Sequence, residues 1–458
     1  MRKVTTVAAL LGLLGAGLAG SVTASAAGRH GDAGPRLLPR GGRISSIARP
    51  EASSARIRSA RPGVSTCTTP GSGNYKADCN STGRPTNETT IANNGTTFVA
   101  GSNDYNSYNG NADLGYYWST DAKTWNDAGP LDLYPNASLN AAGDPGLAID
   151  AAGNVYYSNI FFSYTDCTVG GVELSRYDAV AGTWSYYQIA ANSDAAFQDK
   201  PAVAQDGTRV WVSWTEYGSC TGIDVPSPIK VAVFVAGGSS SPPKKILSVP
   251  GSTYSQGSSM IPDGHGGFFI TWEEFPSPSA TVGSIKLAHF KKGIGWNTPS
   301  TISPPGFQDL PSPLPGGYVF RDNSFPWIAL LAGKPRVVWA SYDTGVGRVY
   351  LWQNGQVSTV SDSGGDQFFS SVFADGSKLE ISWSQTMSSN QSYDQYLSDG
   401  GVVSKISTAS SFPNKDTFFG GSFIGDYNTT TGLSGAAHPV WTDIRGPTYA
   451  QNTMVYAA

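Results

Sequence analysis

Short segments that alternate apolar and polar residues recur along most of the chain, for example "VWVSW", "FFITW" and "LEISW". A period of two is typical of β-strands. The segments are joined by turns such as "NNG", "AAGN" and "ADG", whose residues tolerate the positive φ of tight hairpins. No stretch has a sustained helical period. The pattern therefore predicts β-hairpins throughout and an all-β fold.

One unit is repeated: an apolar strand, a glycine-containing turn, and a second strand that ends in an acidic or polar residue. Its copies begin at Thr89, Pro145, Pro201, Ser258, Pro326, Phe369 and Gly432. Each copy is too small to enclose a core by itself, so radial repetition into a propeller buries the strands best. We predict a single β-propeller of four-stranded blades over residues 67–458, with seven blades favoured over six.

The first 66 residues differ from the rest. Residues 1–26 have a basic start, a short apolar run and the small residues Ala24-Ser25-Ala26, which is the pattern of a secretory signal peptide. The apolar run is too short for a comfortable membrane span. Residues 27–66 hold eight arginines and few apolar residues, which predicts a disordered linker or pro-segment. We expect a secreted, extracellular protein with no membrane span.

The charge balance limits the partners. The whole chain has a net charge of −4, but residues 67–458 contain 20 basic and 32 acidic residues, a net charge of −12. Nucleic-acid binding needs a basic surface, so this class of partner is excluded. An extracellular glycan or glycoconjugate is the expected partner, and a monomer is the expected state.

Four cysteines in an exported chain indicate two disulfides. Cys67 and Cys79 are the natural close pair, which leaves Cys167 with Cys220; the latter two follow the second strands of neighbouring repeats. Their spacing does not fit a zinc site. Acidic residues offer oxygen ligands for calcium, but no EF-hand spacing is present. We expect no cofactor, with calcium left open.

A turn-like motif carries a family resemblance. The segment Ser119–Trp125, "STDAKTW", resembles the Asp-box of sialidase-type propellers, although it is one residue shorter and lacks the glycine. "YDAVAGTW", ending at Trp184, resembles a second copy. The resemblance to bacterial secreted members of the sialidase-like superfamily (BNR repeat proteins) runs from about Arg84 to Arg445. It implies that the box is a structural turn between outer strands, in which Asp121 binds turn amides and Trp125 packs between blades.

Hairpin geometry places the start of each first strand and the end of each second strand at one mouth of the disc. The carboxylates before first strands are Asp144, Asp199, Asp366 and Asp426. Those after second strands are Asp104, Glu216, Glu273, Glu274, Asp343 and Asp443. Paired carboxylates are what cleavage of a glycosidic bond needs. The alternative, which we favour for the first four, is a repeat feature in which each Asp binds loop amides.

The resemblance also implies site residues. Sialidases bind the substrate carboxylate with three arginines, and Arg84, Arg321 and Arg445 are the candidates near the mouth. Asp113 best matches the general acid, and Asp104 is the second choice. Tyr427 with Glu216 is the suggested Tyr–Glu nucleophile pair, without a clear motif.

Two functions follow. The first is a glycoside hydrolase of exo-sialidase type acting on extracellular glycans. The second is a non-catalytic propeller that binds a carbohydrate or a protein. A Ser-His-Asp triad lacks an obvious base, because the chain has only four histidines.

Overall fold

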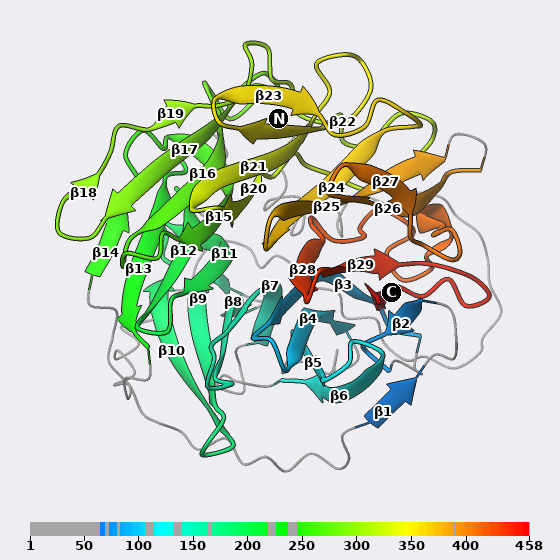
Figure 1. Ribbon diagram of the computed structural model, residues 1–458, viewed down its shortest axis with the longest axis horizontal. Helices are drawn as coiled ribbons and strands as arrows, with labels where there is room; N and C mark the ends of the chain where they lie inside the picture. Colours follow the sequence, from blue (N-terminus) through cyan, green and yellow to red (C-terminus); the bar gives the residue numbers. More distant parts are fainter. Residues whose placement is uncertain are drawn as a thin grey trace.

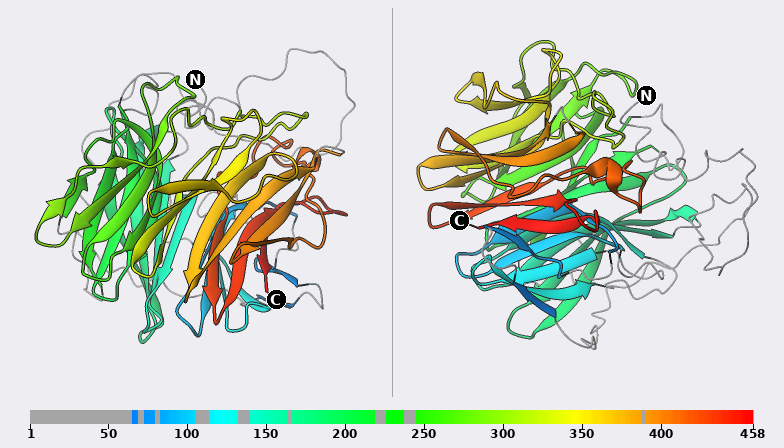
Figure 2. Two further views of the ribbon diagram at one scale, coloured as in Figure 1. Left: turned by 45° about the horizontal axis from the view of Figure 1, so that its top comes forward. Right: turned by 90° about the vertical axis from the view of Figure 1, so that its right-hand side faces the viewer.

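The computed structural model describes residues 65–68, 73–79, 83–105, 114–131, 140–163, 166–218, 226–236, 245–387 and 390–457. In this part of the chain seven antiparallel sheets surround a common axis (Figure 1). Figure 2 shows them from the side, with strands running from one face of the disc toward the other. The protein is a seven-bladed β-propeller, as predicted, and the alternative of six blades is wrong.

The two inner strands of every blade come from the seven repeated units. The innermost strands are β3 (Thr86–Asn93), β7 (Asn140–Ile149), β11 (Phe197–Gln205), β15 (Tyr254–Pro262), β20 (Trp327–Leu331), β24 (Gln367–Asp375) and β28 (Thr429–Leu433). Their partners are β4 (Phe98–Asp104), β8 (Val155–Ser163), β12 (Arg209–Tyr217), β16 (Phe268–Phe275), β21 (Lys334–Ser341), β25 (Lys378–Met387) and β29 (Ala436–Asp443). We number the blades 1 to 7 in this order.

The outer strands complete each blade. The third strands are β5 (Leu114–Ser119), β9 (Asp166–Asp178), β13 (Ile229–Val235), β17 (Ser284–Lys291), β22 (Arg348–Gln353), β26 (Ser392–Asp399) and β30 (Asn452–Tyr456). Fourth strands of blades 1 to 6 are β6 (Thr124–Pro130), β10 (Thr183–Ala191), β14 (Lys245–Ser248), the short β18 (Gly295–Trp296) with β19 (Ser300–Thr301), β23 (Gln356–Thr359) and β27 (Val402–Lys405). A short 3₁₀ turn, η2 (Pro413–Lys415), precedes blade 7.

The core lies between neighbouring blades. Both faces of a blade pack against another blade, so alternate residues of each strand are apolar on one side or the other. Trp211 of blade 3, for example, lies in one cluster with Phe268 and Ile270 of blade 4. Burial of a large aromatic side chain contributes roughly 1.5 to 3 kcal/mol by removal from water. The ring of blades is therefore held together chiefly by apolar contacts between sheets.

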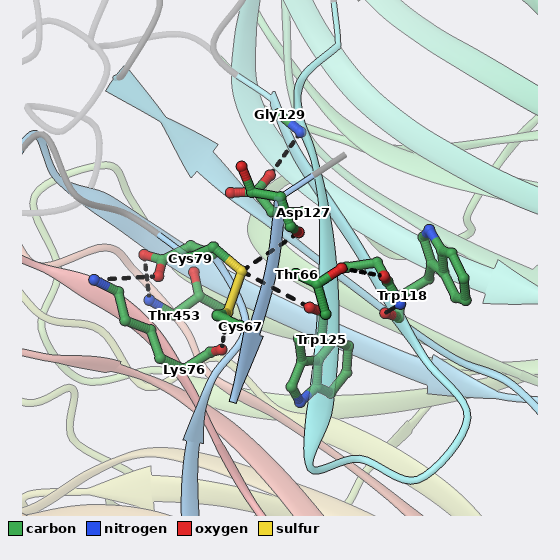
Figure 3. The surroundings of a disulfide bond; sticks show 12 residues. Thr66, Cys67, Lys76, Cys79, Trp118, Trp125, Asp127, Gly129 and Thr453 are labelled. Atoms are coloured by element: carbon green, nitrogen blue, oxygen red, sulfur yellow. Dashed lines mark hydrogen bonds and ion pairs between the residues drawn. A yellow bond between two sulfur atoms is a disulfide. The ribbon is translucent and has the colours of Figure 1, made fainter. Parts of the chain in front are cut away.

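The N-terminal segment closes the ring. β1 (Ser65–Thr68) adds a fifth strand to blade 1 beside β6, and β2 (Asn74–Lys76) adds the fourth strand of blade 7 beside β30. The predicted Cys67–Cys79 disulfide joins β1 to the segment that follows β2, with a Cα–Cα distance of 5.4 Å. Figure 3 shows the bond between the strand of Trp125 on one side and Lys76 and Thr453 on the other. We call residues 65–79 the clasp.

Several predictions fall outside the described residues. The signal peptide (1–26) and nearly all of the linker (27–66) lie there, as does Cys220. The Cys167–Cys220 bond therefore stays a prediction. Among the described residues, no helix has the length and apolar character needed to cross a membrane.

The Asp-box-like segment is a turn between β5 and β6, as expected. Asp121 Oδ1 accepts hydrogen bonds from the amides of Lys123 and Thr124, at 2.8 and 2.7 Å. The fully buried Trp125 packs with Val440 and Val455 of blade 7. The second copy behaves alike, because Trp184 of blade 2 packs edge-on against Tyr116 of blade 1. The motif is structural.

Candidate functional site

A bulge near the start of the innermost strands directs side chains to the axis. In five blades two residues of this strand lie opposite one residue of its partner. The first bulge residue has positive φ in each case: Glu88, Asp144, Lys200, Gly257 and Phe369, with φ between 49° and 63°. Such φ values are unfavourable for residues with a side chain, so the surrounding sheet must impose them.

Charged residues meet where these bulges converge. The Lys200 ammonium lies 3.4 Å from Glu88 Oε1, 3.6 Å from Asp144 Oδ1 and 3.4 Å from Asp426 Oδ2. It also lies 4.1 Å from the ring centroid of Tyr427. These residues come from blades 1, 2, 3 and 7. Their mutual contact therefore places them at the axis.

Arg321 adds a second cation from the loop before blade 5. Its Nε and Nη2 donate to the two oxygens of Asp426, at 2.9 and 2.8 Å, and Nη2 lies 3.9 Å from Glu88 Oε1. The guanidinium covers the ring of Phe423, with 4.3 Å to the centroid. A two-pronged pair of this kind fixes the position of both side chains. Asp199 hydrogen bonds to Asp144. We call these six residues the axial cluster: Glu88, Asp144, Asp199, Lys200, Arg321 and Asp426.

The carboxyl groups of this cluster have opposite pKa shifts. Burial, together with the charges of Asp144 and Asp426, raises the pKa of Glu88 well above its ordinary value, although Lys200 opposes this. Burial and Asp144 raise the pKa of Asp199 likewise. Burial also disfavours ionisation of Asp144, but Lys200 and hydrogen bonds from Glu88 and Asp199 outweigh it and lower the pKa of that carboxyl.

These shifts balance the charge of the site. Burial would lower the pKa of Lys200, yet Asp144, Glu88 and Asp426 together raise it, so the ammonium is charged. The raised pKa values of Glu88 and Asp199 favour their neutral forms and so reduce the negative charge that faces Lys200 and Arg321. A nearly dry site requires this, because an unbalanced buried charge is costly.

Asn103 of β4 ties blades 1 and 2 together beneath the cluster. Its Nδ2 donates to Glu88 Oε2 at 3.1 Å, and its Oδ1 accepts from the Asp144 amide at 3.0 Å. Gly143 lies so close that a Cβ there would be 2.5 Å from Asn103 Oδ1, and its φ is 101°. Only glycine fits this position without displacing Asn103.

The predicted catalytic residues are dispersed. Asp113 lies outside the described residues. Asp104 is buried at the end of β4. Glu216 pairs with Lys230 of the same blade at 3.3 Å. Tyr427 lies in the axial region, and its hydroxyl donates to the Pro145 carbonyl at 2.9 Å. Tyr427 and Glu216 thus bind different groups, and burial with the charges of Glu88 and Asp144 raises the Tyr427 pKa.

The three predicted arginines also have different partners. Arg321 belongs to the axial cluster. Arg445 pairs with Asp443 through Nε and Nη2, at 2.6 and 2.7 Å, and its Nη2 reaches Asn74 of the outer strand β2. Arg84 donates to the Tyr105 carbonyl at 3.3 Å. Convergence of all three on one ligand carboxylate stays a prediction.

Acidic or polar ends of the second strands have a structural role in several blades. The side chain two residues after the buried tryptophan accepts its indole N–H: Glu274 for Trp272, Gln385 for Trp383 and Asp443 for Trp441, at 3.1, 3.3 and 3.0 Å. A buried indole N–H needs such an acceptor. This part of the repeat therefore serves packing.

Sequence reasoning missed Glu88 and Lys200. It also treated Asp144 and Asp199 as equivalent, whereas Asp144 occupies the bulge position of its strand and Asp199 precedes the bulge residue Lys200. The repeat copies that begin at Thr89, Pro145 and Pro201 already place Glu88, Asp144 and Lys200 in one column, directly before each copy, but charges of opposite sign hid their shared position. Within the described residues, no group of three or more His, Cys, Asp or Glu side chains could hold a metal ion.

No family model matches the chain, and no curated protein matches it. Its structure is similar to an α-L-arabinanase of Penicillium chrysogenum complexed with arabinobiose, at 12% identity, covering 86% of this chain and 98% of that one, with a TM-score of 0.48. A Trypanosoma rangeli sialidase mutant displaying trans-sialidase activity has 10% identity, coverage of 71% and 55%, and a TM-score of 0.42. A Dyadobacter fermentans protein of unknown function has 11% identity, coverage of 72% and 96%, and a TM-score of 0.44. The seven-bladed propeller fits the sialidase-like resemblance seen in the sequence. At these identities the function has to be argued from this chain's own residues.

Proposed function

We propose that the protein is a secreted, glycan-active propeller that hydrolyses glycosidic bonds at the axial cluster. The observation that carries the proposal is the pair of adjacent carboxyl groups with opposite pKa shifts, Glu88 raised and Asp144 lowered. Glycoside hydrolysis needs one carboxyl that holds a proton and one that is ionised, about 5 Å or more apart. A sugar that enters this site therefore has to break the hydrogen bond between Glu88 and Asp144. Secretion is supported by the signal-peptide pattern and by a disulfide that persists in oxidising compartments.

In this proposal Glu88 protonates the leaving oxygen, because burial raises its pKa and so favours the form that carries the proton. Asp144 is the carboxylate that activates water or attacks the sugar. Lys200 keeps Asp144 ionised and is therefore a positioning residue. Asp113 or Asp104, which the family resemblance suggests as the acid, is the competing assignment.

The cluster favours a neutral sugar over a sialic acid. Arg321 is already bound by both oxygens of Asp426, so a substrate carboxylate would have to displace Asp426 from that guanidinium. It would also approach the anionic Asp144. Both effects oppose an anionic ligand at this position.

A specific observation supports the second candidate, a non-catalytic binding propeller. Glu88 is 1% exposed and Lys200 8% exposed, and their polar atoms are engaged by neighbours. A site so well satisfied without ligand can serve as a rigid floor beneath a bound carbohydrate or protein. Turnover separates the two functions.

The test is a screen of the purified protein against arabinan, xylan, galactan, sialosides and uronic-acid glycans, with release of reducing ends as the readout. We expect E88Q and D144N each to reduce kcat at least a hundredfold, with K230M, at the partly exposed Glu216 pair, unchanged. Activity carried by Glu88 should also fall as pH rises through its raised pKa. Loss of activity in D113N or D104N but not in E88Q would transfer the acid role to that residue. Binding without cleavage of any glycan would establish the binding propeller.

A further inference from the structure

A cluster of aromatic rings lies near the axial cluster, formed by Tyr105, which follows β4, and by Phe418 and Phe419 from the loop before blade 7. The ring centroids are 5.6 Å apart for Tyr105–Phe418, 5.1 Å for Tyr105–Phe419 and 4.8 Å for Phe418–Phe419. Tyr105 lies just after the end of the second strand of blade 1, and Phe418 and Phe419 lie before the first strand of blade 7. They therefore share the mouth of the disc toward which the axial bulges lie. We call these three rings the aromatic platform.

The platform is fixed by the backbone. Asp416, which is buried, accepts hydrogen bonds from the amides of Phe418 and Phe419, at 3.2 and 3.0 Å, and from Gln451 Nε2 at 3.1 Å. Arg84 donates to the Tyr105 carbonyl. A ligand that binds here loses little free energy to loop ordering, because the rings are already held.

Ring contacts connect the platform to the axial cluster. Phe419 packs edge-on against Phe423, with 5.4 Å between centroids, and Phe423 supports the guanidinium of Arg321. Arg321 in turn binds Asp426 of the axial cluster. A chain of direct contacts thus runs from the platform to the carboxyl groups, which makes the platform continuous with the proposed site.

The outer ring of the platform is open to solvent. Phe418 is 42% exposed, whereas Tyr105 and Phe419 are partly exposed. Phe418 continues into the two partly exposed rings, so the three form one apolar surface rather than a single exposed side chain. The negative face of an aromatic ring attracts C–H groups, which a pyranose presents on its apolar face. The choice of a neutral sugar rests on these ring faces, since the cation beside the platform, Arg84, is bound to the Tyr105 carbonyl.

We propose that Phe418 and Tyr105 form a subsite that stacks against a neutral pyranose residue of a glycan chain that extends to the axial cluster. This inference rests on the proposed glycan-directed function. It makes the protein a reader of glycan chains, because the contacts from Phe418 to Arg321 pass through two further rings, Phe419 and Phe423, which is farther than one sugar spans.

The test compares F418A, F418W and the control W118A in the full-length protein. Trp118 is 36% exposed near the far end of β5, away from the mouth. The probes are β-1,4-galactotetraose, cellotetraose, arabinotetraose and sialyllactose, measured by calorimetric titration and by hydrolysis kinetics. We expect F418A to weaken binding of one neutral pyranose tetrasaccharide, or raise its KM, about three- to tenfold, with kcat unchanged. F418W should restore it, and W118A should match the wild type.

The outcomes separate this subsite from the proposed function. If the wild type binds a pyranose oligosaccharide and F418A binds it equally well, the subsite is refuted while the glycan-directed function stands. If F418A weakens binding but E88Q does not change hydrolysis, the subsite stands and the catalytic assignment fails. An effect of F418A confined to arabinotetraose or sialyllactose overturns the choice of a neutral pyranose. No binding of any probe by the wild type refutes both.

Discussion

Replacing Lys200 with methionine should unbalance the axial cluster while keeping the length of the side chain. In the native cluster the ammonium lies within 3.6 Å of Glu88, Asp144 and Asp426. Arg321 can still neutralise Asp426 in the variant, but Asp144 loses its cation. The variant therefore contains one buried carboxylate without a compensating charge.

The magnitude follows from burial. Removing one partner of a buried ion pair costs about 3 to 5 kcal/mol, because the remaining charge is left uncompensated. Asp144 is 9% exposed, so solvent screens it poorly. The matched control is K230M: Lys230 pairs with Glu216 at a similar distance, 3.3 Å, but both side chains are partly exposed. Loss of such a surface pair costs about 0 to 1 kcal/mol.

The pH dependence distinguishes a charge effect from a packing effect. The pKa of Asp144 is lower in the folded protein than in the unfolded chain. Its ionised form therefore stabilises the fold at pH values above the ordinary carboxyl pKa of about 4. This stabilisation is lost as the pH falls through the folded-state pKa. Raised values, as at Glu88 and Asp199, act oppositely: their contribution is present at low pH and is lost as pH rises through the folded pKa. In K200M the Asp144 carboxyl can take up a proton, which removes the uncompensated charge.

The assay is urea unfolding of wild type, K200M and K230M at pH 7 and pH 4.5, followed by tryptophan fluorescence. We expect a large deficit of K200M at pH 7 that shrinks at pH 4.5, and little change in K230M at either pH. A K200M deficit of equal size at both pH values would show that Lys200 acts through packing. No deficit at pH 7 would refute the ion-pair geometry of the axial cluster.

Two further changes probe the clasp and the Asp-box-like turn. The double variant C67S/C79S should lose about 2 to 4 kcal/mol of unfolding free energy, because the cross-link restrains the unfolded chain. Urea unfolding with and without reductant measures this loss. An unchanged midpoint would show that strand pairing alone holds the clasp. W125A should lose about 3 to 5 kcal/mol, since the ring fills the contact between blades 1 and 7, whereas W118A on the exposed side of blade 1 should lose far less. Equal losses in the two variants would contradict a role for Trp125 between blades.

The fold was readable from the sequence because each blade repeats a local signal. Strand alternation and glycine turns are determined by nearby residues, and seven copies of one hairpin predict a ring. The Asp-box-like turn was predictable for the same reason, since Asp121 binds amides within three positions of itself. The clasp disulfide also followed from spacing, because Cys67 and Cys79 are only 12 residues apart.

The axial cluster was harder to predict because its members come from blades far apart in the chain. A one-residue bulge decides which side chain reaches the axis, so Asp144 and Lys200 occupy one structural position although one is an acid and the other a base. A buried lysine is also rare unless it is paired, and its partners were not visible in its own repeat. Pattern reasoning thus found acidic residues near the mouth but not which of them meet.

The clasp also affects the order in which the ring can assemble. In the β1–β6 pair of blade 1, Cys67 lies opposite Trp125. During synthesis, which starts at the N-terminus, β1 and the Cys67–Cys79 disulfide can therefore form early. Tyr75 of β2, in contrast, pairs with Val455 in blade 7, and must wait until all intervening blades have been made. An unpaired strand edge invites wrong partners, and β2 limits this by being only three residues long and carrying Lys76. The last blade therefore closes onto an edge that was anchored before the ring existed.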